Sequence, residues 1–375
     1  MKNSFRMARV LSMILLLCFA FGVCGSAFAE AELTRVNVGM TPYSMYSIWK
    51  IADELGIDED YGLDLNFVTC TSTANGATLL AGSHDVDISA SCIAEHLACV
   101  ETADNIVNFN VIGDFTGFFF VAPEGLMKPW DELLAENNGD IAAAKEIRLK
   151  EMEGKTFNCI PQRKSMIIDT IQQVGLTEDD INFAFFADDA KAANALIIGS
   201  GDIYIGSLPQ QKALISMGGF VNIGGTDILG ASGLWYDTMM TTEEYIDENF
   251  ETCKKLLAVY FSAVNVFYKD PEAVAPIAAA YLTETTGSTY TEEDWLDMQT
   301  NYDLFMTLED AQSTFYNPES ERYWKVSAEA QLAQLVNDGA LTNPNSVDYY
   351  YGQSQDLFEA LVADEALVEQ IATYA

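Results

Sequence analysis

Basic residues are scarce in this sequence. The chain of 375 residues has 19 lysines and arginines against 56 aspartates and glutamates, which gives a formal net charge of −37 at pH 7. A surface this acidic repels nucleic acid and anionic lipid, so we expect neither as a partner. It also exerts no long-range attraction on small anions. The excess of carboxylates is most simply interpreted as a means of keeping the protein soluble.

Histidine and the sequence motifs of catalysis are nearly absent as well. The only imidazoles are those of His84 and His96, and neither lies near a credible nucleophile in the sequence. The chain has no G-x-S-x-G, H-E-x-x-H or P-loop motif, and no G-x-G-x-x-G after an expected strand. We therefore expect no catalytic residue and no cofactor, and we predict that the protein is not an enzyme.

Cysteine is too sparse for a disulfide scaffold. The sequence has seven cysteines, and the five that follow residue 29 are Cys70, Cys92, Cys99, Cys159 and Cys253. That number is odd, and a chain of this length can bury a core large enough to fold without disulfides. We interpret these five as small core residues, with room for one opportunistic bridge.

Three residues on one expected helix suggest a metal site as an alternative. Cys92, His96 and Cys99 share one helical face at spacings i, i+4 and i+7, and soft ligands with that stagger could hold zinc or copper. A fourth ligand is missing unless His84 or Glu95 supplies it. Packing of this helix face against a sheet is the favoured interpretation, and we predict no metal ligands.

The first 29 residues have the features of a secretory signal peptide. A basic start with Lys2, Arg6 and Arg9 precedes an apolar stretch over 10–23, and an A-x-A cleavage sequence ends at Ala29. The residue before Cys24 fits a lipoprotein signal poorly, so lipid anchoring is not expected. No later apolar run approaches the length of a membrane span. We predict a protein that is periplasmic or secreted after cleavage at Ala29.

What the chain does contain is a clear βαβ unit over 36–68. Val36, Val38 and Met40 alternate as in a short strand, and Pro42 ends it because proline cannot donate to a strand ladder. A helix is expected from 48, after Ser44 or Ser47 as N-cap, and to stop at Gly56, followed by a second strand over 63–68. Open α/β sheets bind ligands at the carboxyl ends of such strands.

The alternation of strands and helices predicts two similar α/β lobes. It continues to about residue 112, begins again at 154, and the segment 79–88 has an echo in 196–205. Residues 30–117 and 222–375 are predicted to form lobe 1, and 118–221 lobe 2, each with a mainly parallel sheet flanked by helices. The C-terminal region is expected to be helical, with helices over 245–266, 274–284, 292–305, 326–338 and 354–373.

The order of several short motifs resembles the nitrate/sulfonate/taurine group of type II periplasmic solute-binding proteins, over about residues 36–209. The motifs of the first lobe are Ala52-x-x-x-Gly56-Ile57, Tyr61-Gly62-Leu63-Asp64-Leu65, and Leu80-Ala81-Gly82 with Asp87. Those of the second lobe are Gly154-Lys155, Gly175-Leu176 with Asp179-Asp180-Ile181, and Ala195-Leu196 with Gly199 and Asp202.

This resemblance implies a two-lobed monomer that closes on one small molecule and passes it to an ABC permease with its ATPase. A small anion such as a sulfonate, taurine or nitrate is the favoured ligand. An aromatic or heterocyclic, pyrimidine-like ligand is the alternative, suggested by Tyr43, Phe115, Phe118 and Trp235. An enzyme of the same fold is a further alternative, against which the export signal counts. A ligand-sensing partner of a membrane receptor also fits the sequence.

Ligand contacts are expected from the loops that follow the strands, where helix N-termini offer unpaired N–H groups. The predicted ligand-binding residues are Tyr43, Ser44, Ser72, Thr73, Asn75, Ser89, Ser91, Phe115, Arg163, Ser165, Ser207 and Trp235.

Arg163 carries the sharpest of these predictions. Its charge opposes the dipole of the helix that it is expected to open, and a guanidinium can hold a carboxylate or sulfonate with two hydrogen bonds. The alternative is a solvated loop arginine. Asp188 and Asp189 could bind an amine, although an N-cap is the favoured interpretation of this pair.

Overall fold

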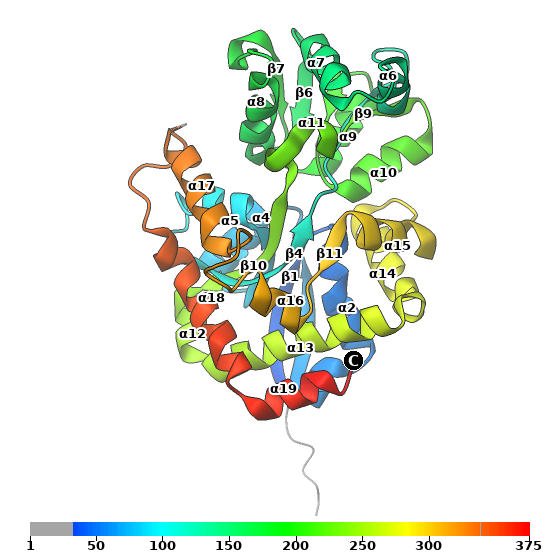
Figure 1. Cartoon of the computed structure of the whole chain (residues 1–375). Helices are drawn as coiled ribbons and strands as arrows, with labels where there is room; N and C mark the ends of the chain where they lie inside the picture. Colours follow the sequence, from blue (N-terminus) through cyan, green and yellow to red (C-terminus); the bar gives the residue numbers. More distant parts are fainter. Residues whose placement is uncertain (1–32, 338) are drawn as a thin grey trace, which may run out of the picture. The chain divides into compact units, whose positions relative to one another are not determined.

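The computed structural model describes residues 33–337 and 339–375, and residues 35–375 form one compact unit (Figure 1). The predicted signal peptide lies outside the described residues. None of the described helices combines the length and the apolar composition that crossing a bilayer requires.

The first sheet, here called sheet A, has the strand order β11-β4-β10-β3-β1-β2. Its strands are β1 (Thr34–Met40), β2 (Leu63–Thr69), β3 (Ile88–Cys92), β4 (Ile106–Phe115), β10 (Trp235–Thr242) and β11 (Asp303–Phe305). Helix α13 contacts α2, α18 and α19, and α18 packs on β4. The helices that accompany sheet A are α2 (Ser47–Glu54), α3 (Ile57–Asp60), α4 (Thr73–Thr78), α5 (Ile93–Cys99), α12 (Glu243–Glu248), α13 (Phe250–Lys269), α14 (Pro271–Thr286), α15 (Glu292–Asn301), α16 (Leu308–Ser313), α17 (Trp324–Asn337), α18 (Val347–Val362) and α19 (Glu365–Ala372).

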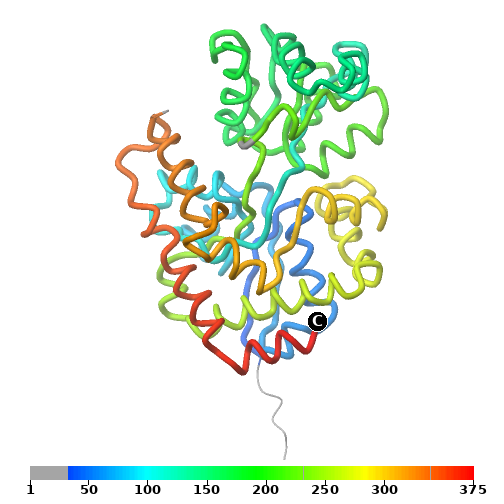
Figure 2. Tube along the Cα trace, in the orientation of Figure 1, coloured from blue at the N-terminus to red at the C-terminus, as the bar shows by residue number. Residues whose placement is uncertain are grey.

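The second sheet, sheet B, has the order β7-β6-β8-β5-β9. Its strands are β5 (Phe120–Pro123), β6 (Thr156–Cys159), β7 (Asn182–Phe185), β8 (Ile203–Tyr204) and β9 (Phe220–Gly224). Its helices are α6 (Trp130–Glu136), α7 (Ile141–Glu151), α8 (Lys164–Gln172), α9 (Asp189–Ile197), α10 (Leu208–Met217) and α11 (Thr226–Leu229). The chain passes from sheet A to sheet B through 116–119 and returns through 225–234, as Figure 2 traces.

The predicted α/β class with two sheets and a helical C-terminal region is confirmed. Parallel pairing holds for β1 with β3 and for β6 with β7 and β8. Antiparallel pairs were not expected, yet β10 pairs antiparallel with β3 and β4, and β5 with β8 and β9. The physical reason is that β10 enters sheet A from sheet B and therefore runs against its neighbours. The division into lobes at 117/118 and 221/222 stays a prediction, and its second boundary falls within β9.

The opening βαβ unit forms as expected, with one local difference. Val36 and Val38 are fully buried, the strand stops at Met40, and Gly56 adopts the left-handed conformation with φ +69°. No serine caps α2 with its side chain, because a short 3₁₀ turn, η1 (Ser44–Tyr46), precedes it. The side chain of Ser47 instead bonds to the carbonyl of Ser44.

Three predicted C-terminal helices differ from the structure. The helix predicted over 245–266 is divided at Asn249 into α12 and α13. The predicted helix over 292–305 ends at Asn301, because residues 303–305 leave it to form β11 at the edge of sheet A. The predicted helix over 354–373 is two helices, since the Asp364 side chain caps a new helix, α19, by accepting a bond from the Leu367 amide. All five cysteines after residue 29 are buried and free, as expected for core residues.

His96 lies in the interior of the sheet A region rather than in a metal site. Its Nε2 is 3.2 Å from the Ile106 carbonyl oxygen, so Nε2 carries the proton, and Nδ1 accepts from the Tyr351 hydroxyl at 3.0 Å. Within the described ranges, no cluster of histidine, cysteine, aspartate or glutamate has the geometry to hold a metal. Burial lowers the pKa of His96 to about 4.

This burial predicts a pH-dependent loss of stability. The folded pKa of about 4 lies below the unfolded value of about 6.5. His96 therefore contributes full stability above pH 6.5 and loses it as the pH falls toward 4. We expect urea unfolding to show the wild-type advantage over His96→Gln shrinking by about 2–3 kcal/mol between pH 7.5 and 4.5. An advantage that is equal at both pH values would contradict this account.

Candidate functional site

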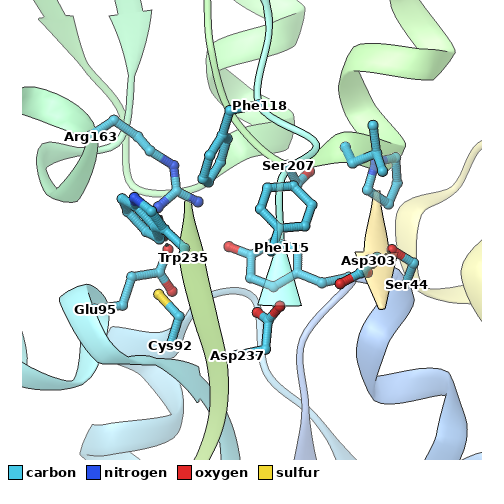
Figure 3. A pocket seen from close by; sticks show the side chains of 13 residues that line it. Ser44, Cys92, Glu95, Phe115, Phe118, Arg163, Ser207, Trp235, Asp237 and Asp303 are labelled. Carbon is cyan, nitrogen blue, oxygen red and sulfur yellow. Dashed lines mark hydrogen bonds and ion pairs between the residues drawn. The ribbon is translucent and has the colours of Figure 1, made fainter. Parts of the chain in front are cut away.

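A small enclosed pocket lies where side chains from both sheets meet (Figure 3). Its volume of about 30 Å³ leaves room for a few water-sized groups in this state of the protein. Sheet A and its helices contribute eight of the lining residues, namely Tyr43, Ser44, Cys92, Glu95, Phe115, Trp235, Asp237 and Asp303. The others come from the first connection, from loops of sheet B and from the start of α10: Phe118, Arg163, Ser207, Leu208 and Pro209.

Half of the predicted ligand-binding residues line this pocket. They are Tyr43, Ser44, Phe115, Arg163, Ser207 and Trp235. They come together because strands β1, β4, β6 and β8 place their following loops here, while β10 begins at the same place. The structure does not bring Ser72, Thr73, Asn75, Ser89, Ser91 or Ser165 to the pocket lining.

Three of these six side chains form hydrogen bonds at or near the start of helix α4. Ser72 accepts a hydrogen bond from the Asn75 amide at 3.2 Å and so caps α4, while Asn75 Oδ1 accepts from the Thr71 amide at 3.1 Å. Thr73 donates to Glu95 Oε2. Thr73 therefore stands behind the pocket and orients one of its acidic residues.

The remaining three are packed or lie at a helix start. Ser89 is fully buried on β3, where its hydroxyl fills the space beside Gly39. A Cβ atom added to Gly39 would lie only 2.7 Å from Ser89 Oγ. The Ser91 carbonyl accepts a bond from the Tyr46 hydroxyl. Ser165 sits in the first turn of α8, half-buried.

Arg163 faces the pocket, and its charge is already matched. It precedes α8 as predicted, and it is 2% exposed, so it is not a solvated loop arginine. Its Nη1 lies 2.8 Å from Glu95 Oε1 and its Nη2 4.0 Å from Asp189 Oδ2. The guanidinium carbon lies 4.2 Å from the ring centroid of Trp235 and 4.7 Å from that of Phe118. This arrangement joins the two sheet regions through one buried cation.

The neighbouring charges set the protonation of this group. Burial alone would lower the pKa of Arg163, but Glu95 and Asp189 raise it above its usual value. Burial raises the pKa of Asp189 to about 6 although Arg163 opposes the shift. The Tyr43 hydroxyl donates to Asp189 Oδ2 at 3.2 Å. Asp188, in contrast, is the side-chain N-cap of α9, as predicted, and accepts from the Lys191 amide at 2.8 Å.

Asp237 and Asp303 form a second charged feature, an acid pair on the opposite side of the pocket from Arg163 (Figure 3). The two carboxyl groups are hydrogen-bonded to each other. Ser44 donates to Asp303 Oδ2, and the Tyr46 hydroxyl lies 3.5 Å from Asp237 Oδ1. Burial and the neighbouring Asp303 raise the pKa of Asp237 well above its usual range, and burial raises the pKa of Asp303 to about 7. The pair therefore shares a proton near neutral pH.

Sequence reasoning did not select four polar residues of the pocket. Glu95 and Cys92 were considered only as metal ligands, and Asp237 and Asp303 not at all. Asp237 had a usable signal, because it is the only charged residue in the strand Trp235–Thr242. Asp303 had none, since β11 is three residues long and follows a helix directly.

No protein-family model and no curated protein matches the chain. Solved structures do match. The periplasmic nitrate-binding protein NrtA from Synechocystis PCC 6803 is similar with a TM-score of 0.64, 14% identity and 91% of both chains covered. The alkanesulfonate-binding protein SsuA from Xanthomonas axonopodis pv. citri, bound to MOPS, has a TM-score of 0.60 and 11% identity, over 86% of this chain and 99% of that one.

A third similar structure is a mutant of DszB in complex with biphenyl-2-sulfinic acid. Its TM-score is 0.55 at 13% identity, with 88% of this chain and 99% of that one covered. Identities this low show the shared fold. The chain therefore has the fold of the periplasmic binding proteins that its sequence motifs resemble.

Proposed function

We propose that this protein is an extracytoplasmic solute-binding protein of an ABC importer, which captures a small organic molecule between two lobes. The observation that carries the proposal is the pocket itself, because side chains from both sheets enclose it. The fold shared with nitrate- and alkanesulfonate-binding proteins supports the same role. The partners would be an ABC permease and its ATPase, and the protein would act as a monomer in the periplasm or outside the cell.

Capture would proceed by closure about the two connections. The segments 116–119 and 225–234 join the proposed lobes, 30–117 with 222–375 and 118–221. A ligand that contacts Ser44 on one side and Ser207 on the other binds the closed state better than the open one. By that difference in affinity it shifts the population toward closure. The Arg163–Glu95 ion pair, which spans the same gap, adds to the stability of the closed state.

The geometry of the pocket supports the ligand hypotheses from the sequence to different degrees. A sulfonate, taurine or nitrate would need an available positive charge. Arg163, the only basic residue that lines the pocket among those the structure describes, is paired with Glu95. The aromatic or heterocyclic alternative has the ring of Phe115 in its favour, since Arg163 already lies against the rings of Phe118 and Trp235. The small anion is therefore retained as a prediction of the sequence resemblance alone.

An enzyme of the same fold has less support. DszB, one of the similar structures, is an enzyme, so the fold permits catalysis. Within the described ranges, Cys92 supplies the only thiol that lines the pocket, and burial, together with the nearby Glu95, raises its pKa well above the usual value. A thiol held protonated is a poor nucleophile, and no described histidine lines the pocket to activate it.

Thermal unfolding and fluorescence test the solute-binding role. Refolded, ligand-free mature protein would be screened against sulfonates, taurine, nitrate, aromatic carboxylates, pyrimidines and amines. A ligand at a hundred times its dissociation constant should add about 2.7 kcal/mol of stability and raise the melting temperature by several degrees. The same ligand should change tryptophan fluorescence, because Trp235 lines the pocket.

Two tryptophan variants localise that signal. Trp235→Phe should lose most of the fluorescence change, whereas Trp324→Phe, which alters a residue outside the pocket lining, should keep it. A ligand whose signal survives Trp235→Phe would place binding elsewhere on the protein. The absence of stabilisation by any compound class would count against the solute-binding role itself.

A further inference from the structure

We infer that the pocket takes a small organic cation, whose ammonium group donates hydrogen bonds to Asp237 and Asp303. This inference rests on the proposed solute-binding function and names the ligand class for the same site. It differs from the small anion that the sequence resemblance favoured.

The balance of charge around the pocket is the first reason. Its lining contains three carboxyl groups, Glu95, Asp237 and Asp303, and one guanidinium. Arg163 is paired with Glu95 and also approaches Asp189, so its charge is fully matched. Among the described residues, no lysine, arginine or histidine lies within ion-pair distance of Asp237 or Asp303. Buried carboxylates without a counter-charge are costly, and a bound cation would supply that charge.

The unused hydrogen-bonding capacity of the acid pair is the second reason. Asp237 is 8% exposed and Asp303 is 2% exposed. Apart from the proton that the two carboxyl groups share, no donor in the described part of the chain reaches Asp237 Oδ2 or Asp303 Oδ1, although both residues line the cavity (Figure 3). A carboxylate oxygen only accepts hydrogen bonds, and an ammonium group offers donors without acceptors. At the acid pair a sulfonate or nitrate would instead present oxygens to oxygens, and its donors would have to come from Arg163 on the other side of the pocket.

The apolar lining limits the rest of the ligand. Phe115, Leu208 and Pro209 surround the pocket beside the acid pair, and they can contact an alkyl or aryl group. The rings of Phe118 and Trp235 are already occupied by Arg163. The volume of about 30 Å³ suits an ammonium head with few carbons, and a longer chain would need the lobes to open further. The net charge of −37 also attracts cations toward the protein.

Cation binding at this place must displace a proton. In the empty protein the acid pair shares one, because burial raises both pKa values and the neighbouring Asp303 raises that of Asp237 further. An ammonium between the carboxylates replaces that proton, which leaves to the buffer. The other titratable or charged groups facing the pair are Tyr46, Cys92, Glu95, Arg163 and Tyr260. Arg163 keeps its charge, and the two hydroxyls and the thiol are protonated already, so these four do not take up the released proton.

Isothermal titration calorimetry in buffers of different ionisation enthalpy measures this linkage. The probes are ethylamine, ethanolamine and putrescine, with ethanesulfonate and acetate as anions of similar size, at pH 7.5. We expect at least one amine to bind with the release of about one proton, and its affinity to rise with pH through neutrality. An anion would require uptake of a proton, because the pair must then be fully neutral. The sign of proton exchange thus separates the two classes.

Matched variants test whether amine binding and proton release depend on the acid pair. Asp237→Asn and Asp303→Asn should each weaken amine binding at least tenfold, as expected for loss of a charge-assisted hydrogen bond, and should change the number of protons released. Asp58→Asn is the control, because Asp58 is a buried carboxyl with a raised pKa that lies outside the pocket lining. It should leave both quantities unchanged.

The outcomes distinguish this inference from the function on which it rests. Binding of ethanesulfonate or acetate with proton uptake, or amine binding that is equal in Asp237→Asn and wild type, would overturn the cation assignment and leave the solute-binding role intact. Failure of these probes and of every class in the thermal screen would reject both.

Discussion

Replacing Arg163 with methionine is expected to lower the free energy of unfolding by about 3–5 kcal/mol, as when one partner is removed from a buried ion pair. The substitution leaves Glu95, which is 2% exposed, as a buried carboxylate without its cation. It also removes the cation that lies against the rings of Phe118 and Trp235. Urea unfolding of the refolded, ligand-free protein measures the loss.

Two further variants isolate the cause of this loss. Arg163→Met combined with Glu95→Gln should recover much of the stability, because no unpaired charge then remains in the interior. Lys164→Met is the matched control at the next residue, where a partly exposed lysine lies 2.7 Å from the exposed Glu178. That pair should be worth less than about 1 kcal/mol. A cost for Arg163→Met no greater than for Lys164→Met would show that the ion pair does not hold the closed pocket together.

Asp303→Asn should have the opposite effect and stabilise the empty protein by up to about 4 kcal/mol at pH 8. The folded pKa of about 7 exceeds the unfolded value of about 3.9. The carboxyl therefore contributes its full stability below pH 4 and loses it as the pH rises toward 7. Asparagine avoids the free-energy cost of burying a carboxylate, and it keeps an acceptor for the Ser44 hydroxyl. Urea unfolding at pH 8 and pH 4 should show a gain at the higher pH only.

The control for this prediction is an exposed carboxylate. Asp356→Asn, on the exposed face of α18, should change stability by less than about 0.5 kcal/mol at either pH. If Asp303→Asn destabilised the protein as much at pH 8 as at pH 4, burial of the acid pair would have no electrostatic cost in free energy. If the gain is found, Asp303 lowers the stability of the empty protein, as residues retained for binding often do.

The fold was largely predictable because its signals are local. The alternation of Val36, Val38 and Met40 and the stop at Gly56 depend on the residues nearest in sequence, and both are observed. The antiparallel insertion of β10 between β3 and β4 was not predictable, because strand order depends on contacts between residues far apart in the chain. The short strand β11 was missed for the same reason.

The site was predictable only where a loop follows a strand. That rule brought Tyr43, Arg163 and Ser207 to the pocket lining. It failed for Ser72 and Asn75, because small polar side chains also satisfy the backbone of their own turn, as these two do at the start of α4. The charge of Arg163 suggested an anion, and only the tertiary structure showed that Glu95 already neutralises it.

The stacking of Arg163 divides the pocket into two parts with separate tasks. Phe118 belongs to the first connection between the sheets, and Trp235 directly follows the second, so a single side chain touches both places where the chain must bend. Asp237 and Asp303 lie on the other side of the cavity (Figure 3). Redesign of the acid pair for another ligand would thus leave the proposed closure in place, whereas a change at Arg163 would alter that closure for every ligand.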